Sequence, residues 1–473
     1  MPRIRTVVRG LAVASLLIAV PDLSAQSLAP HQQLAREVYK QLIEINTSDS
    51  VGDNTAAAEA MAARFRTAGF PAADIFVGGP VPRKGNLVVR YRGRSTAGLK
   101  PILLLAHLDV VEAKKEDWSP DLDPFKFIEK DGYFYGRGTA DDKAMAAIFV
   151  TNLLRMKQQN LVPERDLVLA LTSDEEGGDY NGVEWLIANH RALVDAEFGL
   201  NEGGGGQSKA GRRIANRVQA TEKVYEDFTL EVTNKGGHSS LPQPSNAIYQ
   251  LADALARIAK FTFPVKLNEV TRAYFEKMAS IEQGQVAADF KAVAAPAPDA
   301  AAVGRLSAVP LYNSLLRTTC VATMVNGGHA LNALPQRATA NVNCRILPGE
   351  NPQEVVTTLT QVINDAAVRI TPVKPAKPSQ PSPLKPEIMK VITRVTEEMW
   401  PGVPVVPFMS TGASDSLYFR QIGIPMYGVS GLFGDMDDVR AHGRDERMGV
   451  KDFFDGQEFL WWVVNALSGA KAQ

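Results

Sequence analysis

Residues 166–178 read DLVLALTSDEEGG, an apolar run that passes directly into three carboxylates, Asp174, Glu175 and Glu176. A second run of the same kind, PILLLAHLD, occupies residues 101–109. Runs that are apolar at almost every position are typical of parallel strands buried on both faces of a sheet. Adjacent carboxylates at the end of such a strand repel each other and lose hydration, so the sequence predicts a positive charge close to them.

Helical and strand patterns alternate around these two runs. Apolar residues recur with helical periodicity at residues 31–45 and 54–70, before a strand pattern at 86–93, and again at 141–159 and 180–193. This alternation predicts an α/β fold in which a mostly parallel sheet is flanked by helices.

The pattern changes near Tyr225. An alternating strand at residues 227–234 precedes a helix at 246–261 and a strand pair around the two cysteines, which predicts an inserted α+β domain. Residues 371–386 are too rich in proline for a helix or a central strand and are expected to form the linker back. We therefore expect a signal peptide at 1–25, the main domain at 26–224, the inserted domain at 225–372, and the linker with the rest of the main domain at 373–473.

The N-terminal segment predicts export. Arg3, Arg5 and Arg9 precede an apolar run at residues 11–20 that is too short to span a bilayer, and a cleavage site can follow Ala25. The mature protein is expected to be exported, either periplasmic or secreted. The alternative is an uncleaved N-terminal anchor.

Composition limits the classes of partner. The 473 residues include 51 lysines and arginines against 52 aspartates and glutamates, without a polybasic block. Nucleic acid and anionic membrane surfaces are therefore poor candidates as partners.

Cys320 and Cys344 are the two cysteines of the chain. Their flanking sequences alternate as strands do, and the midpoint between them falls in the loop that separates the two strands, so in an antiparallel hairpin the sulfurs would lie nearly opposite. A disulfide and a pair of buried free thiols both fit this arrangement.

The groups capable of chemistry follow the predicted strands. They are His107 and Asp109, Asp141 and Asp142, Glu175 and Glu176, Glu202, and His442. In open α/β sheets, ligands gather beyond the carboxyl ends of the strands, where these side chains would converge. Histidines and carboxylates in one pocket suit a metal such as zinc.

Charge counting supports a metal. Asp141, Glu176 and Glu202 carry three negative charges, and with one bridging hydroxide they would balance two divalent cations. Each group alone has an ordinary explanation, such as a polar pair, a helix cap or a solvated face. Those explanations do not account for the fact that each group follows a separate strand or loop of one α/β domain. We therefore predict that bound metal compensates the charge of the carboxylates.

The motifs HLDVV, GRGTADDK, TSDEEGG, NEG, GGHSS, NALPQRATANVNCR and STGASDS…HGRDER occur in the order typical of the co-catalytic zinc exopeptidases. This family includes aminoacylase, carboxypeptidase S, glutamate carboxypeptidase and succinyl-diaminopimelate desuccinylase. The chain resembles it over roughly residues 35–470, and most of all its branch of carboxypeptidase S and secreted N-acyl-amino-acid hydrolases.

The resemblance implies a pair of zinc ions bridged by Asp141, with a cis peptide between Asp141 and Asp142. His107 and Glu202 would complete one zinc site, and Glu176 and His442 the other. Two positions depart from the family pattern: Asn201, where many relatives have Asp, and Ala144, where Gly is usual.

The resemblance also implies roles outside the metal ligands. Asp109 would orient the His107 imidazole, and Glu175 would be the general base. His238 would donate to the carbonyl oxygen of the substrate, from its own chain or across a dimer interface. Arg345, assisted by Asn332, would grip the substrate's α-carboxylate. The inserted domain would be a lid, through which a homodimer is expected.

The predicted function is that of a zinc-dependent, carboxypeptidase-like exopeptidase, which hydrolyses an amide bond next to a free α-carboxylate with metal-activated water. The substrate would be a peptide or an N-acyl amino acid, and an aminoacylase acting on the latter is the alternative. A catalytically silent metal-binding receptor is a more remote alternative. The presence of Glu175, the predicted general base, argues against it. A serine hydrolase lacks support, because no G-x-S-x-G motif occurs.

Overall fold

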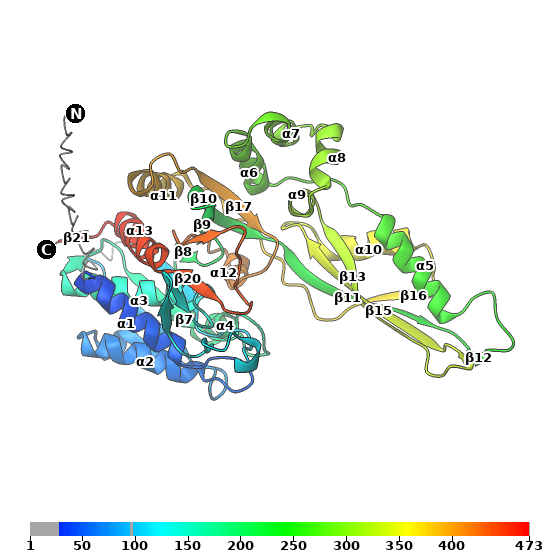
Figure 1. The fold of residues 1–473 in the computed structure, drawn as a ribbon, viewed down its shortest axis with the longest axis horizontal. Coiled ribbons are helices and arrows are strands. Elements are labelled where there is room, and N and C mark those ends of the chain that lie inside the picture. Colours follow the sequence, from blue (N-terminus) through cyan, green and yellow to red (C-terminus); the bar gives the residue numbers. More distant parts are fainter. Residues whose placement is uncertain (1–27, 95–97, 473) are drawn as a thin grey trace, which may run out of the picture.

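The computed structural model describes residues 28–94 and 98–472, arranged in two lobes (Figure 1). The predicted signal peptide lies outside the described residues. We call the two lobes the main lobe, which holds the largest sheet and both described ends of the chain, and the lid, which is built from the inserted segment.

The main lobe is organised around a ten-stranded sheet. Its centre, β7-β3-β8-β18, is parallel, whereas β1, β2 and β9 pair antiparallel with their inner neighbours and β10 pairs antiparallel with β18 and parallel with β17. The strand order is β1 (Ile75–Gly78), β2 (Asn86–Tyr91), β7 (Leu167–Thr172), β3 (Ile102–His107), β8 (Phe198–Asn201), β18 (Met426–Gly428), β10 (Arg212–Glu222), β9 (Gly206–Lys209) and β19 (Phe433–Asp435), with β17 (Val405–Ser410) beside β10.

Helices cover both faces of this sheet, which explains the continuous apolar runs. Along β3 and β7 alternate side chains enter two different cores, with Leu104 and Leu169 on one side and Leu103 and Val168 on the other. The first core is closed by α1 (Pro30–Glu44), α2 (Asn54–Thr67), α3 (Lys143–Gln158), α11 (Pro386–Met399) and α13 (Val450–Ser468), and the second by α4 (Gly182–Val194) and α12 (Ser416–Gln421). The predicted fold class, a mostly parallel central sheet flanked by helices, is confirmed.

The lid is a four-stranded antiparallel sheet with helices on one face. Its order is β13 (Thr319–Gly327), β15 (Arg337–Ile346), β11 (Val224–Thr233) and β16 (Val368–Pro372), and its helices are α5 (Ala247–Lys260) and α10 (Pro352–Ile363). Along β15 every second side chain is buried against the helices, and the others face the open side. This alternation is typical of a sheet with one solvated face.

One continuous segment joins the lobes. β10 belongs to the main sheet and β11 to the lid sheet, and only Lys223 separates them. The return path is the proline-rich linker that follows β16 and leads to α11.

Four helices of the inserted segment pack on the main lobe. They are α6 (Glu269–Ala279), α7 (Gly284–Ala294), α8 (Ala300–Ser307) and α9 (Pro310–Leu316). Their apolar side chains form one core with Val406, Phe408 and Met409 of β17. We call the junction of the two lobes, where β10 passes into β11, the hinge. This group of helices therefore extends the main lobe beside the hinge (Figure 1).

Short elements complete the chain. They are β4 (Ile128–Lys130), β5 (Tyr133–Tyr135) and β20 (Arg447–Gly449) in one small sheet, the pair β12 (Gly237–His238) and β14 (Ala333–Leu334), the pair β6 (Leu161–Val162) and β21 (Lys471–Ala472), and the 3₁₀ turns η1 (Ala72–Asp74) and η2 (Lys115–Asp117).

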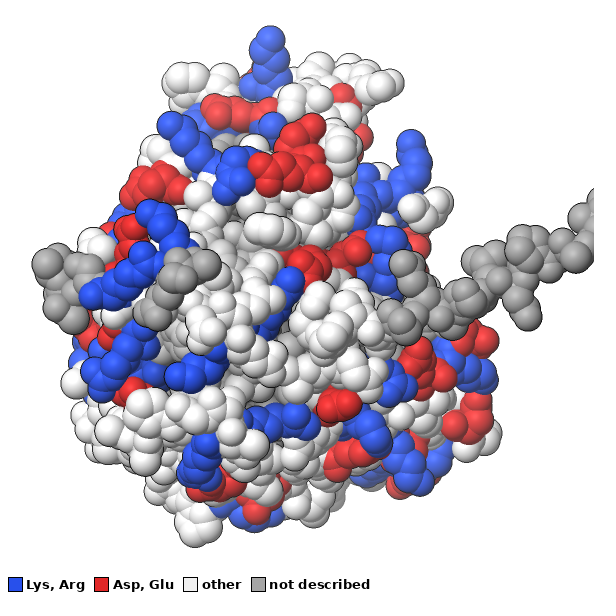
Figure 2. Space-filling model, turned by 90° about the vertical axis from the view of Figure 1, so that its left-hand side faces the viewer, with Lys and Arg blue, Asp and Glu red and all other residues white. Residues whose placement is uncertain are grey.

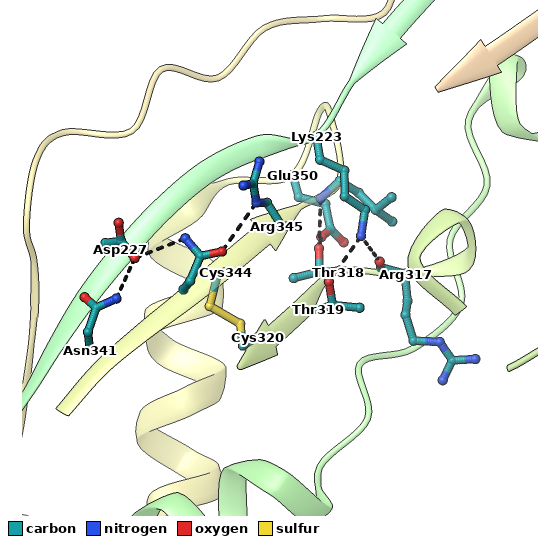
Figure 3. The surroundings of a disulfide bond; sticks show 12 residues. Lys223, Asp227, Arg317, Thr318, Thr319, Cys320, Asn341, Cys344, Arg345 and Glu350 are labelled. Carbon is teal, nitrogen blue, oxygen red and sulfur yellow. Dashed lines mark hydrogen bonds between the residues drawn. A yellow bond between two sulfur atoms is a disulfide. The ribbon is translucent and has the colours of Figure 1, made fainter. Parts of the chain in front are cut away.

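Cys320 and Cys344 form a disulfide. They are directly opposite each other in the β13–β15 register, as the position of the loop between them predicts. Of the two alternatives left open by the sequence, the structure has the cross-link (Figure 3).

The surface of the main lobe carries both signs of charge. Figure 2 shows acidic and basic side chains interspersed over the face opposite the lid. Among the helices within 28–94 and 98–472, none combines the length and the apolar character that a membrane crossing requires.

Candidate active site

Three of the predicted metal ligands converge at the carboxyl ends of the parallel strands. His107 is the last residue of β3, Asp141 precedes α3, and Glu176 lies in the loop after β7. One ligand atom of each lies within 4.8 Å of the others. Their proximity follows from strand pairing, because β3 and β7 are adjacent and parallel, with His107 opposite Thr172.

His107 is buried and held from both sides. Its Nε2 atom lies 3.0 Å from Asp141 Oδ1, and its Nδ1 atom lies 3.0 Å from the backbone oxygen of Asp109 and 3.6 Å from the Oδ1 atom of that residue. The other carboxylate oxygen of Asp109 accepts a hydrogen bond of 2.9 Å from the Glu176 backbone N–H. In this structure the imidazole is therefore hydrogen-bonded to the backbone of Asp109, whose carboxylate contacts the loop that carries Glu175 and Glu176.

His442 joins the cluster from far along the chain. Its Nε2 atom lies 3.1 Å from Asp141 Oδ2 and 2.9 Å from Glu176 Oε1. Hydrogen bonds to Asp141 and Glu176 raise the pKa of His442 to about 10. Half of its side chain is exposed, so the cluster opens to solvent on this side.

The remaining acidic groups crowd the same space. Glu202 follows β8, and burial raises the pKa of its carboxyl, with a further contribution from the charges of Asp141 and Asp142. Burial likewise raises the pKa of Glu175. For Asp141, burial alone would raise the pKa, but hydrogen bonds from His107 and His442 outweigh it and lower the pKa. Without a cation these neighbouring carboxyls oppose each other's ionisation.

The donor set fits divalent metal ions. Two imidazoles and three carboxylates from separate loops offer the nitrogen and oxygen ligands that zinc takes in catalytic sites. The peptide between Asp141 and Asp142 is cis, as the family resemblance implies. Asn201 donates from Nδ2 to Ser416 Oγ at 2.9 Å, so this departure from the family pattern contacts α12.

The positive charge beside Asp174 is a lysine, which the sequence did not predict. The carboxylate of Asp174, the first of the three in the opening motif, pairs with the buried Lys84 ammonium rather than with a metal. Lys84 lies 90 residues away, just before β2, which is adjacent to β7 in the sheet. Only the pairing of β2 with β7 brings the two together, and the local sequence carries no sign of it.

A second buried ion pair was also missed. Arg137 Nη1 lies 2.6 Å from Glu446 Oε2, and both side chains are almost fully buried. Arg137 also donates to the backbone oxygen of His442 at 3.3 Å, and Glu446 accepts from the backbone N–H of Ala140 at 2.7 Å. The pair therefore links the loop of Asp141 to the loop of His442. Both residues lie inside family motifs, Arg137 in GRGTADDK and Glu446 in HGRDER. Their position in these motifs is the signal by which the sequence could have indicated them.

Asp415 is a further residue that sequence reasoning did not select. Its carboxylate accepts from Asn181 Nδ2 at 2.7 Å and from Thr172 Oγ1 at 3.1 Å. These contacts place it behind the loop of Glu175, whose pKa its charge helps to raise. Burial raises the pKa of Asp415 itself to about 7.

Arg345 lies at the hinge, on the open face of the lid sheet. Its guanidinium is 4.5 Å from the centre of the Tyr225 ring, and its Nη1 atom donates to the backbone oxygen of Thr411 at 3.4 Å. Figure 3 shows Arg345 beside Cys344, near Lys223 at the junction of the lobes. Arg345 is thus held close to the main lobe by contacts that leave its charge without a carboxylate partner among the described residues.

His238 and Asn332 lie elsewhere. β12, which contains His238, is at the end of the lid farthest from the main lobe (Figure 1). The backbone oxygen of Asn332 accepts from Ser239 N at 3.0 Å, so both residues belong to this tip. β11 spans about 30 Å between hinge and tip. Within one chain the structure therefore brings together neither His238 with the metal cluster nor Asn332 with Arg345.

The two-lobed fold and the cluster at the strand ends define a class of protein, an enzyme with a candidate metal centre in its main lobe. The chain belongs to peptidase family M20/M25/M40, whose model matches residues 103–465. It is therefore a hydrolase, and the family predicted from the motifs is confirmed.

Named relatives agree with the branch that the motifs indicate. The chain is 30% identical to the "N-fatty-acyl-amino acid synthase/hydrolase PM20D1" of Xenopus tropicalis over 364 residues, which cover 75% of this chain and 70% of the relative. It is 29% identical to "Probable carboxypeptidase S-like 2" of Dictyostelium discoideum over 394 residues, covering 80% and 74%.

Solved structures share the fold. An M20 family metallo-carboxypeptidase of Sulfolobus solfataricus superposes with a TM-score of 0.64 at 17% identity, over 93% of this chain and all of the other. A Bacillus subtilis protein described as a dinuclear metal binding peptidase of the M20 family superposes with a TM-score of 0.56 at 12% identity, over 93% and 99%.

Proposed function

We propose that the protein is an exported, zinc-dependent, carboxypeptidase-like hydrolase that cleaves the amide bond next to a free α-carboxylate. The observation that carries this proposal is the convergence of His107, Asp141, Glu176 and His442, with Arg345 at the adjoining hinge. The residues 1–25 support export by their sequence alone.

Five residues would hold two zinc ions: His107, Asp141, Glu176, Glu202 and His442. When bound, such ions polarise the substrate carbonyl and lower the pKa of the attacking water. Glu175 takes the proton of that water and delivers it to the leaving nitrogen, so that one C–N bond breaks and one C–O bond forms without a covalent intermediate. Asp109 keeps the His107 imidazole in place through Nδ1.

Arg345 would grip the α-carboxylate of the substrate. A guanidinium offers two parallel N–H donors to a carboxylate, and the Tyr225 ring and Thr411 already fix its plane. A substrate bound in this way must have a free α-carboxylate. The proposed clamp therefore favours an enzyme that acts on the last residue of a peptide or on an N-acyl amino acid.

The second candidate is an N-acyl-amino-acid hydrolase of the aminoacylase type. The name of the Xenopus relative favours it, since that protein is described as acting on N-fatty-acyl amino acids. Both candidates need the same carboxylate clamp and differ in what lies on the other side of the amide. A catalytically silent metal-binding receptor remains the remote alternative, and the retained Glu175 argues against it.

The position of His238 supports a homodimer through the lid. β13 is an edge strand whose side chains are largely exposed, including Val321, Met324 and Val325. An exposed apolar edge is suited to pairing with another strand. A second copy joined there would bring its own His238 and Asn332 towards this chain's hinge, where the first would donate to the carbonyl oxygen and the second would assist Arg345.

The test is a hydrolysis screen of the zinc-loaded mature protein with dipeptides and with N-acyl amino acids of short and long chains. Glu175→Gln should lose at least about a hundredfold in kcat because the proton acceptor is gone, while elemental analysis still finds about two zinc ions per chain. His107→Ala should lose metal and activity together. Full activity of Glu175→Gln, or hydrolysis that persists after complete chelation of metal, would refute the proposal.

A further inference from the structure

A cavity of about 400 Å³ lies at the hinge, and one of its lining residues is Tyr225, which contacts Arg345. Its walls come from the end of β10 and the start of β11, from the linker after β16, and from α12 with the loop before it. Its lining residues include Tyr225, Glu226, Lys223, Ala413 and Leu417. Its volume lies in the range of about 300–1,000 Å³ that is usual for cavities that bind small molecules.

The cavity shares walls with the carboxylate clamp. The Tyr225 ring that lines it also carries the Arg345 guanidinium, and Ala413 lies two residues after Thr411, whose backbone oxygen Arg345 contacts. Two residues further on, Asp415 is hydrogen-bonded behind the loop of Glu175. Residues 411–415 thus run from the clamp, past the cavity, to the catalytic loop.

The cavity exists because the linker leaves the sheet. β16 pairs with β11 from Phe228 to Val232, Val373 N donates one further hydrogen bond of 2.8 Å to Asp227 O, and the linker then departs from β11. The first residues of β11 consequently have β15 as their sole strand partner in the described part of the chain. Val224, Val373, Pro375 and Leu417 give the cavity an apolar wall.

Glu226 is the exception in this wall. Its side chain is only 2% exposed, and its Oε1 atom has no hydrogen-bond partner among the described residues. A buried carboxyl without a partner costs free energy, so the fold keeps an acceptor here that another group can satisfy.

The other charged groups of the wall have partners of their own, including Lys374, which lies 3.3 Å from Asp179, and Asp227, which accepts from Asn341 and Asn343. Lys223 directs its ammonium to the backbone oxygen of Arg317 at 2.6 Å, on the far side of the hinge (Figure 3). Lys377 pairs with Glu184 at 2.8 Å, and Glu222 pairs with Arg420 at 3.0 Å.

We propose that this cavity receives the side chain of the amino acid whose α-carboxylate Arg345 grips, and that Glu226 selects a long side chain whose apolar stem ends in a hydrogen-bond donor. This inference rests on the proposed function. Tyrosine and lysine side chains both have this chemistry, the first with a neutral phenol and the second with a cationic ammonium.

The test is a series of substrates with one acyl group and different amino acids: glycine, alanine, phenylalanine, tyrosine, norleucine and lysine. We expect kcat/KM to be lowest for glycine and alanine, and to be about tenfold higher for tyrosine than for phenylalanine, or for lysine than for norleucine, because one buried hydrogen bond is gained. The two pairs distinguish the phenolic from the cationic donor.

Two variants locate the effect. Glu226→Leu should reduce the favoured pair ratio to about one, since the acceptor is gone, and Leu417→Trp should lower the phenylalanine-to-alanine ratio about tenfold by filling the cavity. The matched control is Glu231→Leu, the same replacement in the same strand outside the cavity, which should leave all ratios unchanged.

The outcomes separate the two proposals. If the zinc-loaded wild-type protein hydrolyses none of the series, the proposed function fails. If it hydrolyses them without regard to side-chain length, or with equal rates within both pairs, only the cavity assignment is overturned. Because the wild-type ratios decide this point, the test holds even where a variant does not fold.

Discussion

Several of the predicted metal ligands are held in place by residues that are not ligands themselves. Asp109 contacts both the His107 imidazole and the Glu176 backbone, and Glu446 contacts the backbone next to Asp141. Such supporting contacts fix the direction of a ligand before any metal binds. The chemistry of the site therefore depends on buried residues that are not ligands themselves.

Arg345→Ala should raise KM about 10- to 100-fold for substrates with a free α-carboxylate, because a bidentate ion pair is lost. Steady-state kinetics on matched free and carboxyl-amidated substrates checks this. Equal effects on both kinds of substrate would contradict the clamp.

Glu446→Gln should destabilise the protein by about 3 kcal/mol, because it leaves the buried Arg137 guanidinium without its counter-charge. Denaturant unfolding measures the loss. Zinc content should also fall, since the loops of Asp141 and His442 lose their common anchor. Glu398→Gln, which removes the exposed pair with Arg394 on α11, is the control and should have little effect.

Among the elements, the segment from β10 through Lys223 to β11 decides how the lobes meet. It carries the buried Glu222 and Lys223 and the cavity residue Glu226 within five positions. Burial lowers the pKa of Lys223 to about 7 and raises the pKa of Glu226 to about 7. The junction of the lobes thus contains two groups whose pKa values burial shifts towards neutral pH.

The raised pKa of Glu226 predicts how the stability of the protein should change with pH. Its pKa is raised from 4.5 to about 7 in the folded state, so its contribution to stability is fully present below pH 4.5 and is lost as pH rises through 7. Glu226→Gln does not titrate, so the variant should gain stability relative to wild type between pH 4.5 and pH 8. Thermal unfolding of both proteins at these two pH values measures the difference. A difference that does not change with pH would show that Glu226 is not buried as described.

At the scale of the whole molecule, the separation of His238 from the metal cluster is the main consequence of the two-lobed shape (Figure 1). A lid about 30 Å long cannot place its tip residues and its hinge residues at one site of the same chain. The proposed twofold dimer through the lid would resolve this, because each lid tip would then serve the other copy.

Mixed dimers test this arrangement directly. Glu175→Gln and His238→Ala chains are each expected to be inactive alone. When the two are unfolded and refolded together, heterodimers should regain about half of the wild-type activity, because one of the two sites then combines an intact Glu175 with an intact His238. Each variant refolded alone is the control. No recovery in heterodimers of confirmed composition would show that His238 does not act across the interface.

The sequence by itself determined the α/β class, the family, and which side chains would meet at the strand ends. These follow from local signals: continuous apolar runs mean strands covered on both faces, and polar residues just after parallel strands share one edge. The cysteine pairing was half determined, since the loop position placed the residues opposite each other and left their redox state open.

Only the tertiary structure decided the rest. The pairing of Lys84 with Asp174 and of Arg137 with Glu446 depends on which strands and loops become neighbours, and no local pattern encodes that choice. The packing of α6 to α9 on β17, and the hinge cavity with Glu226, likewise arise from contacts between segments far apart in sequence. Counter-charges and cavities are properties of three-dimensional packing, whereas periodicity and motif order are properties of the chain.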